Sequence, residues 1–337
     1  MEPLAALRRI AYQLEAAAAP SYKVRAFRHA ANAIEPIDRS ELEDLASKGR
    51  LKSIDGVGDT TSQVITEALA GETPKYLEKL AEDALPPLGG AVAELRNSLR
   101  GDCHSHSDWS DGGSPIREMA ETARDLGLEY LALTDHSPRL TVAHGLDRKR
   151  LLEQLDVVAR LNDELAPFRI LTGIEVDVLE DGSLDQDDDL LERLDVVVAS
   201  VHSKLRMGSE EMTPRMLAAI DSPHTDVLGH CTGRILAGRG RPPSTFDPEV
   251  VFEACARTGT AVEINSRPER RDPPTELLQL ALDAGCLVSI DSDSHAPGQF
   301  EWLRYGCEKA VDAAIATDRI VNSWPQEKLL DWTAGHD

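Results

Sequence analysis

The chain has 337 residues, a length that suits two domains. Hydrophobic residues make up 41% and charged residues 28%, which is typical of a folded protein and excludes a disordered one. The formal net charge of −23 argues against a protein that coats nucleic acid or an anionic membrane with its whole surface. No apolar run approaches the ~18 residues of a membrane span, and no signal peptide is recognisable. We therefore expect a cytoplasmic protein without a membrane partner.

Charge and composition divide the chain into two parts. Residues 1–100 are almost neutral, so nearly all of the negative charge lies in the remainder. Two prolines and two glycines in residues 83–91 are typical of a boundary. We predict a helical domain over residues 1–85, a linker over 86–100 and a large domain over 101–337. The five cysteines form no C-x-x-C pair and are expected to be reduced thiols.

The first part reads as short amphipathic helices with two features that favour DNA binding. The predicted helix after Pro20 carries Lys23, Arg25 and Arg28 largely off its apolar stripe. Gly56 and Gly58 then flank a valine between two helical patterns, which is the helix-hairpin-helix pattern. Glycines allow a phosphate to approach the backbone, and the next helix offers free N–H groups. The alternatives are a solvated helix face and a plain turn with a glycine cap.

The large domain alternates short apolar strands with amphipathic helices about seven times. Such alternation is typical of a parallel sheet covered by helices, and this many units suit a closed α/β barrel of the (β/α)7 type. Each predicted strand is followed by histidine, carboxylate or other polar residues. Because the carboxyl ends of barrel strands converge on one mouth, these side chains are expected to meet. The candidate ligands are His104, His106, Asp111, His136, Glu175, His202, His230, Asp293 and His295.

The nature of these nine side chains predicts a metal centre. Imidazoles and carboxylates without thiolates favour zinc, manganese or iron. His104 and His106 are separated by one residue, so on a strand both rings point to the same side. Nine ligands exceed the needs of one tetrahedral ion and suffice for two or three.

The motifs HSHSDWSDG, TDHS, GIEVD, SVHS, GHCTG and SDSH together resemble the PHP (polymerase and histidinol phosphatase) domain, from Gly101 to about Ala316. Residues 1 to about 80 resemble the N-terminal helix-hairpin-helix domain of bacterial family X DNA polymerases. The polymerase palm is missing, because about fifteen residues stand where it would be, so the chain is not a polymerase. The helix DTTSQVITEAL, residues 59–69, lacks the lysine that forms a Schiff base in members with lyase activity, which leaves a binding role.

The PHP resemblance implies three divalent ions. Their ligand sets would be His104, His106, Glu175 and Asp293; Glu175, His202 and His230; and Asp111, His136 and His295. Glu175 would bridge two ions, which activate a hydroxide for attack on phosphorus. Asp102 and Asp135 are candidates for holding ring nitrogens of the ligands. The candidate phosphate-binding residues are Arg234, Arg270, Asn265 and Lys204.

Two functions remain after these steps. The first is a hydrolase of phosphoric esters that acts on DNA ends or damaged DNA, as a 3′–5′ exonuclease, a 3′-phosphatase or an abasic-site endonuclease in DNA repair. The second is a small-molecule phosphatase of the histidinol-phosphate type, which the strong negative charge favours. A DNA-binding protein with a structural metal site and a metal-dependent amide hydrolase explain the nine ligands less well.

Overall fold

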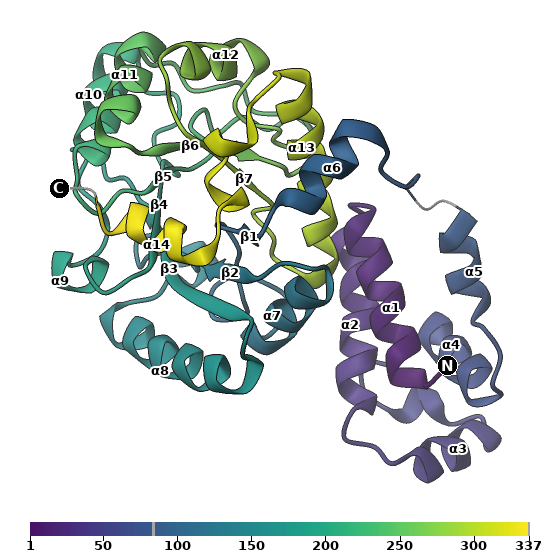
Figure 1. The fold of residues 1–337 in the computed structure, drawn as a ribbon. Helices are drawn as coiled ribbons and strands as arrows, with labels where there is room; N and C mark the ends of the chain where they lie inside the picture. The colour runs from purple at the N-terminus through teal and green to yellow at the C-terminus, as the bar shows by residue number, and fades with distance from the viewer. Residues whose placement is uncertain (83–84, 336–337) are drawn as a thin grey trace. The chain divides into compact units, whose positions relative to one another are not determined.

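The computed structural model describes residues 1–82 and 85–335. They form two compact units, Met1–Pro87 and Leu88–Asp337, which are described one at a time. Figure 1 shows that the first unit is entirely helical and that the second contains all of the strands. Among the described residues, no helix combines the length and the apolar character that a membrane crossing requires.

The first unit packs five helices around a small apolar core. The helices are α1 (Pro3–Ala16), α2 (Ser21–Ile34), α3 (Arg39–Ser47), α4 (Asp59–Leu69) and α5 (Lys75–Glu82). Helix α1 lies at the centre of this packing, because Leu7 and Ile10 are fully buried against Phe27 of α2 and Ile65 of α4. The apolar residues of α1 recur at helical spacing, which explains why one face of this helix is completely covered.

The predicted hairpin is present between a short 3₁₀ turn (Leu51–Ser53) and α4. Gly56 has a φ of +85°, a conformation that suits glycine, and a Cβ there would lie 3.4 Å from the carbonyl oxygen of His29. The hairpin therefore packs directly against the backbone of α2. Gly58 is the N-cap of α4, and its amide donates a hydrogen bond to Thr61 Oγ1 at 2.9 Å.

The surroundings of Arg28 differ from those expected of a DNA contact. Its guanidinium is buried and donates two hydrogen bonds to Glu15, from Nε at 2.8 Å and from Nη2 at 2.9 Å. Helical spacing places Arg28 on the side of α2 that faces α1, where an acidic partner on α1 accepts it. Lys23 and Arg25 are exposed, as a DNA contact requires.

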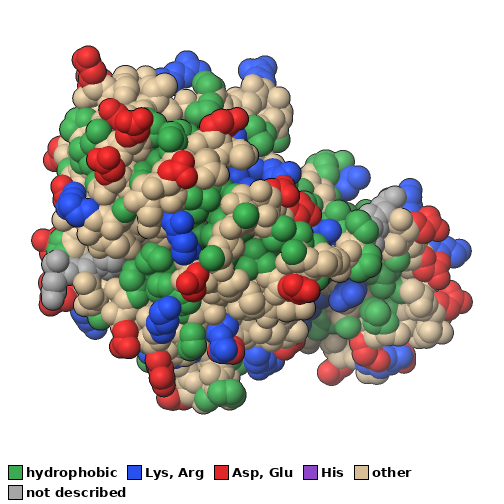
Figure 2. All heavy atoms as spheres, turned by 45° about the horizontal axis from the view of Figure 1, so that its top comes forward, with side chains coloured by type: hydrophobic (Ala, Val, Ile, Leu, Met, Phe, Trp, Pro, Cys, Tyr) green, Lys and Arg blue, Asp and Glu red, His purple; other side chains and the backbone are tan. Residues whose placement is uncertain are grey.

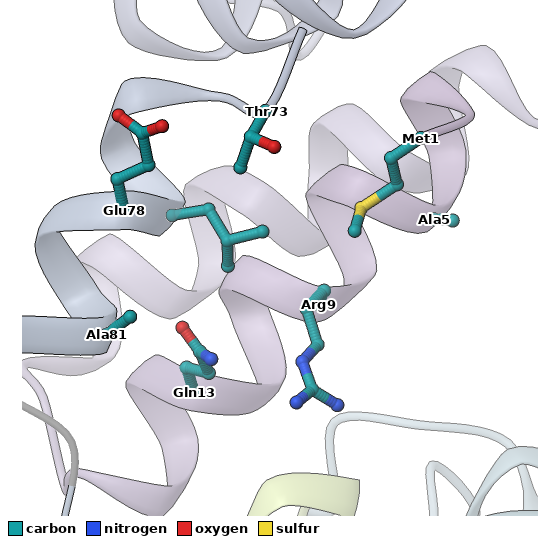
Figure 3. A pocket seen from close by; sticks show the side chains of 8 residues that line it. Met1, Ala5, Arg9, Gln13, Thr73, Glu78 and Ala81 are labelled. Atoms are coloured by element: carbon teal, nitrogen blue, oxygen red, sulfur yellow. The ribbon is translucent and has the colours of Figure 1, made fainter. Parts of the chain in front are cut away.

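A hollow of about 580 Å³ lies between α1 and α5 in this unit (Figure 3). Leu77 and the side chains of Met1 and Arg9 line it, and none of the predicted site residues does.

Arg28→Ala should lower the free energy of unfolding of the first unit by about 3 kcal/mol, because the buried carboxylate of Glu15 loses its charged partner. Arg25→Ala, in an exposed position three residues earlier, should change stability little. Denaturant unfolding of the full chain measures both variants. Unchanged stability together with weakened DNA binding would restore the interpretation of Arg28 as a DNA contact.

The second unit is a barrel of seven parallel strands in the sheet order β1 to β7. The strands are β1 (Gly101–Asp102), β2 (Tyr130–Leu133), β3 (Arg169–Asp177), β4 (Val196–Ser200), β5 (Val227–Leu228), β6 (Ala261–Asn265) and β7 (Val288–Asp291). A bridge between Ser105 and Ser294 joins the segments that follow β1 and β7, and the His106 amide donates to the Ser294 carbonyl at 2.8 Å. The predicted fold class is thus confirmed.

Helices cover the outside of the barrel (Figure 1). They are α6 (Gly90–Ser98), α7 (Ile116–Asp125), α8 (Arg148–Leu165), α9 (Asp188–Leu191), α10 (Ser209–Ile220), α11 (Pro248–Thr258), α12 (Thr275–Asp283), α13 (Leu303–Asp312) and α14 (Gln326–Thr333). Helix α6 lies within residues 86–100, which were predicted to be a linker. It forms because Leu95 is buried in the same apolar cluster as Leu303 and Cys307 of α13. On the face drawn in Figure 2, acidic and basic side chains are interspersed.

The first strand ends at Asp102, and the reason lies in the neighbouring side chains. Beyond Asp102 the backbone leaves the ladder and donates hydrogen bonds to side chains. The Cys103 amide donates to Asp291 Oδ1 at 2.9 Å, and the Ser105 amide donates to Thr134 Oγ1 at 3.0 Å. These bonds fix residues 103–106 across the mouth of the barrel.

Candidate metal centre

All nine predicted ligands converge at the carboxyl ends of the strands, where the chain leaves each strand of the barrel. His104, His106, Glu175, Asp293 and His230 are almost completely buried. His136 is buried as well, whereas His202 and His295 are half-buried, and the side chain of Asp111 is 37% exposed. The mouth therefore has a closed inner part and an open edge at Asp111.

Glu175 lies at the middle of the cluster, and its two oxygens face different histidines. Oε1 is 2.8 Å from His230 Nε2 and 3.2 Å from His202 Nε2. Oε2 is 2.8 Å from His136 Nδ1 and 3.4 Å from His104 Nε2. Glu175 is on β3, the longest strand of the barrel, which carries this residue into the centre of the mouth. A carboxylate divided in this way is suited to bridge two cations.

Asp293 approaches the cluster from β7 in an unusual backbone conformation. Its φ is +50°, which a residue with a side chain adopts only when its surroundings hold it there. Oδ1 is 3.5 Å from His106 Nε2, and Oδ2 accepts a hydrogen bond from Asn265 Nδ2 at 3.0 Å. Arg267 Nη1 donates to the Asp293 carbonyl at 3.0 Å, which helps to hold the strained backbone.

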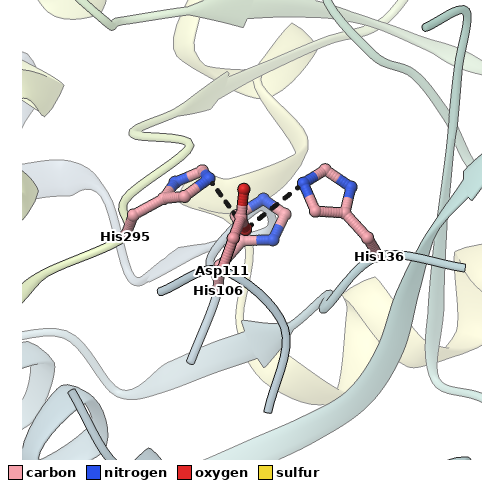
Figure 4. Close-up of side chains that lie close together, drawn as sticks. All are labelled: His106, Asp111, His136 and His295. Carbon is pink, nitrogen blue, oxygen red and sulfur yellow. Dashed lines mark ion pairs between the residues drawn. The ribbon is translucent and has the colours of Figure 1, made fainter. Parts of the chain in front are cut away.

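The open edge of the cluster is drawn in Figure 4. Asp111 Oδ1 lies 3.5 Å from His136 Nε2 and 3.3 Å from His295 Nε2. His106 points into the same group. The described residues contain three groups in which all possible ligand atoms lie within 4.8 Å of one another. The groups are His106, Asp111, His136 and His295; His104, His106 and Glu175; and His136, Glu175 and His202. His106 and His136 each belong to two groups, so the predicted division of ligands among three ions remains a prediction.

The electrostatics of the cluster fit divalent cations. Burial alone would raise the pKa of Glu175, but the imidazoles of His202, His136 and His104 hold it well below its usual value. The pKa of Asp293 also lies well below its usual range. Burial alone would raise this pKa, but the positive charges of Arg267 and His104 outweigh that effect. Both carboxylates are therefore ionised in the interior, where a charge needs a compensating partner.

Unpartnered ring nitrogens point to the same conclusion. Within the described residues, His104 Nε2 and both ring nitrogens of His106 are buried without a hydrogen-bond partner. A buried polar atom is nearly always satisfied, so these nitrogens need another partner. Neutral imidazole nitrogens beside ionised carboxylates are the donor set that zinc, manganese and iron accept. The residues present therefore fit divalent transition metals.

Glu263, which the sequence analysis missed, orients two of the ligands. Oε1 is 2.6 Å from His104 Nδ1, so Nδ1–H donates to the carboxylate and Nε2 is directed at Glu175. Oε2 accepts a hydrogen bond from the backbone amide of His230. The sequence did hold an indication of this role, because Glu263 precedes Asn265 by two residues and therefore shares its face of β6.

The roles predicted for Asp102 and Asp135 are corrected by the structure. Neither carboxylate touches a ligand ring by hydrogen bonding. Asp102 accepts from the His104 amide at 3.2 Å and from the Ser292 hydroxyl. Burial raises its pKa to about 6. Asp135 accepts from the Ser107 amide at 2.9 Å and from Gln154 Nε2 at 2.6 Å. Both residues therefore hold the backbone around His104 and His106.

The predicted phosphate-binding residues occupy different places. Arg270 is at the cluster, with Nε 3.4 Å from Asp293 Oδ2. Arg234 instead stabilises the loop after β6. Its Nε donates a hydrogen bond to the Arg270 carbonyl at 2.9 Å, and its Nη2 donates to the Arg271 carbonyl. Asn265 donates to Asp293, so it positions a ligand. Lys204 Nζ is 3.9 Å from a carboxylate oxygen of Glu180, at the exposed rim.

The fold and the nine side chains define a parallel barrel with a candidate metal centre at its mouth. Its family follows from comparison with known proteins. Residues 102–248 match the model of the PHP domain, and residues 1–74 match that of a helix-hairpin-helix domain. The chain therefore contains a PHP domain preceded by a helix-hairpin-helix domain, which confirms both resemblances.

Two curated relatives bear on the activity. The chain is 39% identical over 225 residues to the DNA polymerase/3′-5′ exonuclease PolX of Bacillus subtilis, an alignment that covers 67% of this chain but only 39% of the relative. It is 29% identical over 232 residues to a probable phosphatase of Syntrophotalea carbinolica, covering 66% of this chain and 90% of the relative. These names agree with the prediction of a hydrolase that acts on phosphoric esters.

Among solved structures, a histidinol phosphate phosphatase of Lactococcus lactis, complexed with zinc, L-histidinol and phosphate, has a TM-score of 0.46 and 18% identity. The match covers 65% of this chain and 95% of that chain.

Asp111→Asn should release the ion at the open edge before any other ion. The variant loses the negative charge that offsets this cation, at the edge of the cluster where water competes most for the ion. The initial rate should fall by orders of magnitude and return in part as manganese is raised. A metal titration of the rate, with metal content measured beside it, tests this. Asp108→Asn, in the same loop, is the matched control. A variant that keeps its full rate at low metal would show that Asp111 is not a ligand.

Proposed function

We propose that the chain is a metal-dependent phosphoesterase that acts on DNA ends or damaged DNA, of the 3′–5′ exonuclease, 3′-phosphatase or abasic-site endonuclease type. The observation that carries the proposal is the buried position of Glu175, whose two oxygens face different sets of histidines. Divalent ions held there, zinc, manganese or iron and up to three in number, supply an activated water nucleophile and an electrophile for phosphoryl oxygens.

The chain's own residues then bind and orient a phosphate beside that centre. Arg270 lies at the cluster next to His230 and Asp293. Arg241, which the sequence analysis missed, lies near it: burial and the positive charge of Arg270 both lower the pKa of the Arg241 guanidinium. Two like charges held close together favour binding of an anion. A phosphate group satisfies that requirement, and a neutral substrate does not.

The helical unit supports DNA as the carrier of that phosphate. Lys23 and Arg25 are exposed on α2, and the hairpin at Gly56 packs against the same helix. The first turn of α4 follows Gly58 and offers free backbone amides to a phosphate. Helix α4 carries no lysine, so this unit binds DNA without forming a Schiff base. The exonuclease name of the Bacillus relative agrees with this assignment.

A small-molecule phosphatase of the histidinol-phosphate type is the second candidate. One observation favours it: the probable phosphatase of Syntrophotalea carbinolica is matched over 90% of its own length. The helical unit argues for DNA, because a metabolite phosphatase has no need of it.

The two functions are separated by offering the full chain, with manganese, three substrates in parallel: a 3′-labelled nicked duplex, an abasic duplex and histidinol phosphate. We expect turnover of at least one DNA substrate with a higher kcat/KM than for histidinol phosphate. Lys23→Ala combined with Arg25→Ala should raise the KM for DNA and leave hydrolysis of histidinol phosphate unchanged. Lys79→Ala, on the exposed surface of α5, is the matched control. Efficient hydrolysis of histidinol phosphate without any DNA product would contradict the proposal.

A further inference from the structure

Charge is unevenly distributed around the mouth of the barrel. The loop after β4, residues 201–208, carries Lys204 and Arg206 and no acidic residue. Residues 229–246 after β5 carry three arginines and no acidic residue. The segment 266–273 after β6 has three arginines against one glutamate and one aspartate. These three segments, called the basic rim below, follow strands that are neighbours in the sheet.

The segments on either side of the basic rim have the reverse charge. The loop after β3, residues 178–187, contains four acidic residues and no basic one. The segments after β1 and β7 carry Asp111 and Asp293 of the metal cluster. The basic rim therefore stands out within the part of the chain that holds almost all of the negative charge, and it borders the metal centre on one side only.

Hydrogen bonds join the three segments into one surface. Ser244 Oγ, from the segment after β5, donates to the Leu205 carbonyl in the loop after β4, at 2.8 Å. The Leu236 amide donates to the Glu269 carbonyl in the segment after β6, at 2.6 Å. A pair of backbone hydrogen bonds between Ile235 and Arg241 closes a small hairpin between these two links. The relative positions of the cationic side chains along the rim are thus fixed by the backbone.

The charges of the rim are available to a ligand. Its two acidic residues are already engaged: Glu269 pairs with Arg267 at 2.9 Å, and Asp272 is buried and accepts from the Thr232 hydroxyl at 2.5 Å. Arg206 and Arg239 are exposed, and neither has an ion pair or hydrogen bond within the described parts of the chain. Two exposed, unpaired arginines remain after the internal pairs are counted.

The rim is also longer than one phosphate group. Neighbouring strands lie about 4.8 Å apart, so the loops after β4 and β6 begin about 10 Å from each other. A single phosphate at Arg270 cannot reach along this length, but successive phosphates of a polynucleotide can. Several cations along a surface beside a candidate catalytic centre are suited to a nucleic-acid backbone.

We infer that the basic rim binds the sugar–phosphate backbone of the nucleic-acid strand that enters the metal centre, so that the strand arrives over β4, β5 and β6. The inference rests on the proposed function and adds to it a second nucleic-acid contact, on the PHP domain itself. Arg206 and Arg239 contact phosphates, and the acidic loop after β3 repels a strand that approaches over that side.

The test measures binding of a fluorescently labelled, nicked DNA duplex to the full chain without added manganese. Anisotropy is recorded at several salt concentrations for the wild type and for Arg206→Ala combined with Arg239→Ala. The slope of log affinity against log salt should fall by about 0.9 for each phosphate contact that is lost. Hydrolysis of a chromogenic phosphate ester with manganese should be unchanged, because neither arginine is at the cluster. Arg160→Ala, exposed on α8, is the matched control.

Each outcome is decisive. A double variant with the affinity and salt slope of the wild type would overturn the inference, whatever the enzyme does to DNA. A reduced slope without added manganese supports the rim even if the wild type fails to process DNA, an outcome that would contradict only the proposed function. A fall in ester hydrolysis equal to the fall in DNA binding would show that the arginines act on the cluster, and would also overturn the inference.

Discussion

The contact between Glu175 and the surrounding imidazoles is the interaction on which the rest of this protein depends. A carboxylate that is almost fully buried keeps its charge only because histidines from the ends of β1, β2, β4 and β5 face it. Removing water from those groups costs free energy that cations at the centre offset. The barrel is therefore coupled to its metal site: closure of the sheet assembles the ligands, and the charge of the ligands requires ions.

Several features of the fold are explained by this requirement. The backbone after β1 leaves the ladder so that His104 and His106 both reach the mouth, and Asp102 and Asp135 hold that backbone in place. Asp293 adopts a left-handed conformation at the end of β7, which Arg267 and Asn265 support. Such strain is found where function requires it and where the surrounding structure determines it. Glu263 fixes the ring of one ligand and the backbone of another from the floor of the site.

The sequence predicted well which side chains meet at the mouth, and poorly which residues support them. Chemically unusual residues at strand ends have only one place to meet in a parallel barrel, so His104 and Glu175 could be assigned without coordinates. Supporting residues have no such rule. Arg28 was expected to contact DNA, but its direction depends on Glu15 of another helix. Arg234 was expected to bind phosphate, yet backbone carbonyls of a distant loop bind its guanidinium. Helix α6 was taken for a linker because its burial depends on α13, which is more than two hundred residues away. These roles depend on tertiary contacts, which local patterns do not encode.

The most direct test of the account is the metal content of the purified full chain and of Glu175→Ala, measured by elemental analysis after removal of loosely bound ions. The account predicts more than one divalent transition metal ion per wild-type chain and the loss of at least one ion in the variant. Glu180→Ala, an exposed carboxylate five residues further along the chain, should keep the wild-type content. A wild-type protein that hydrolyses phosphate esters with one ion or none, or a Glu175→Ala variant with undiminished metal content, would contradict it.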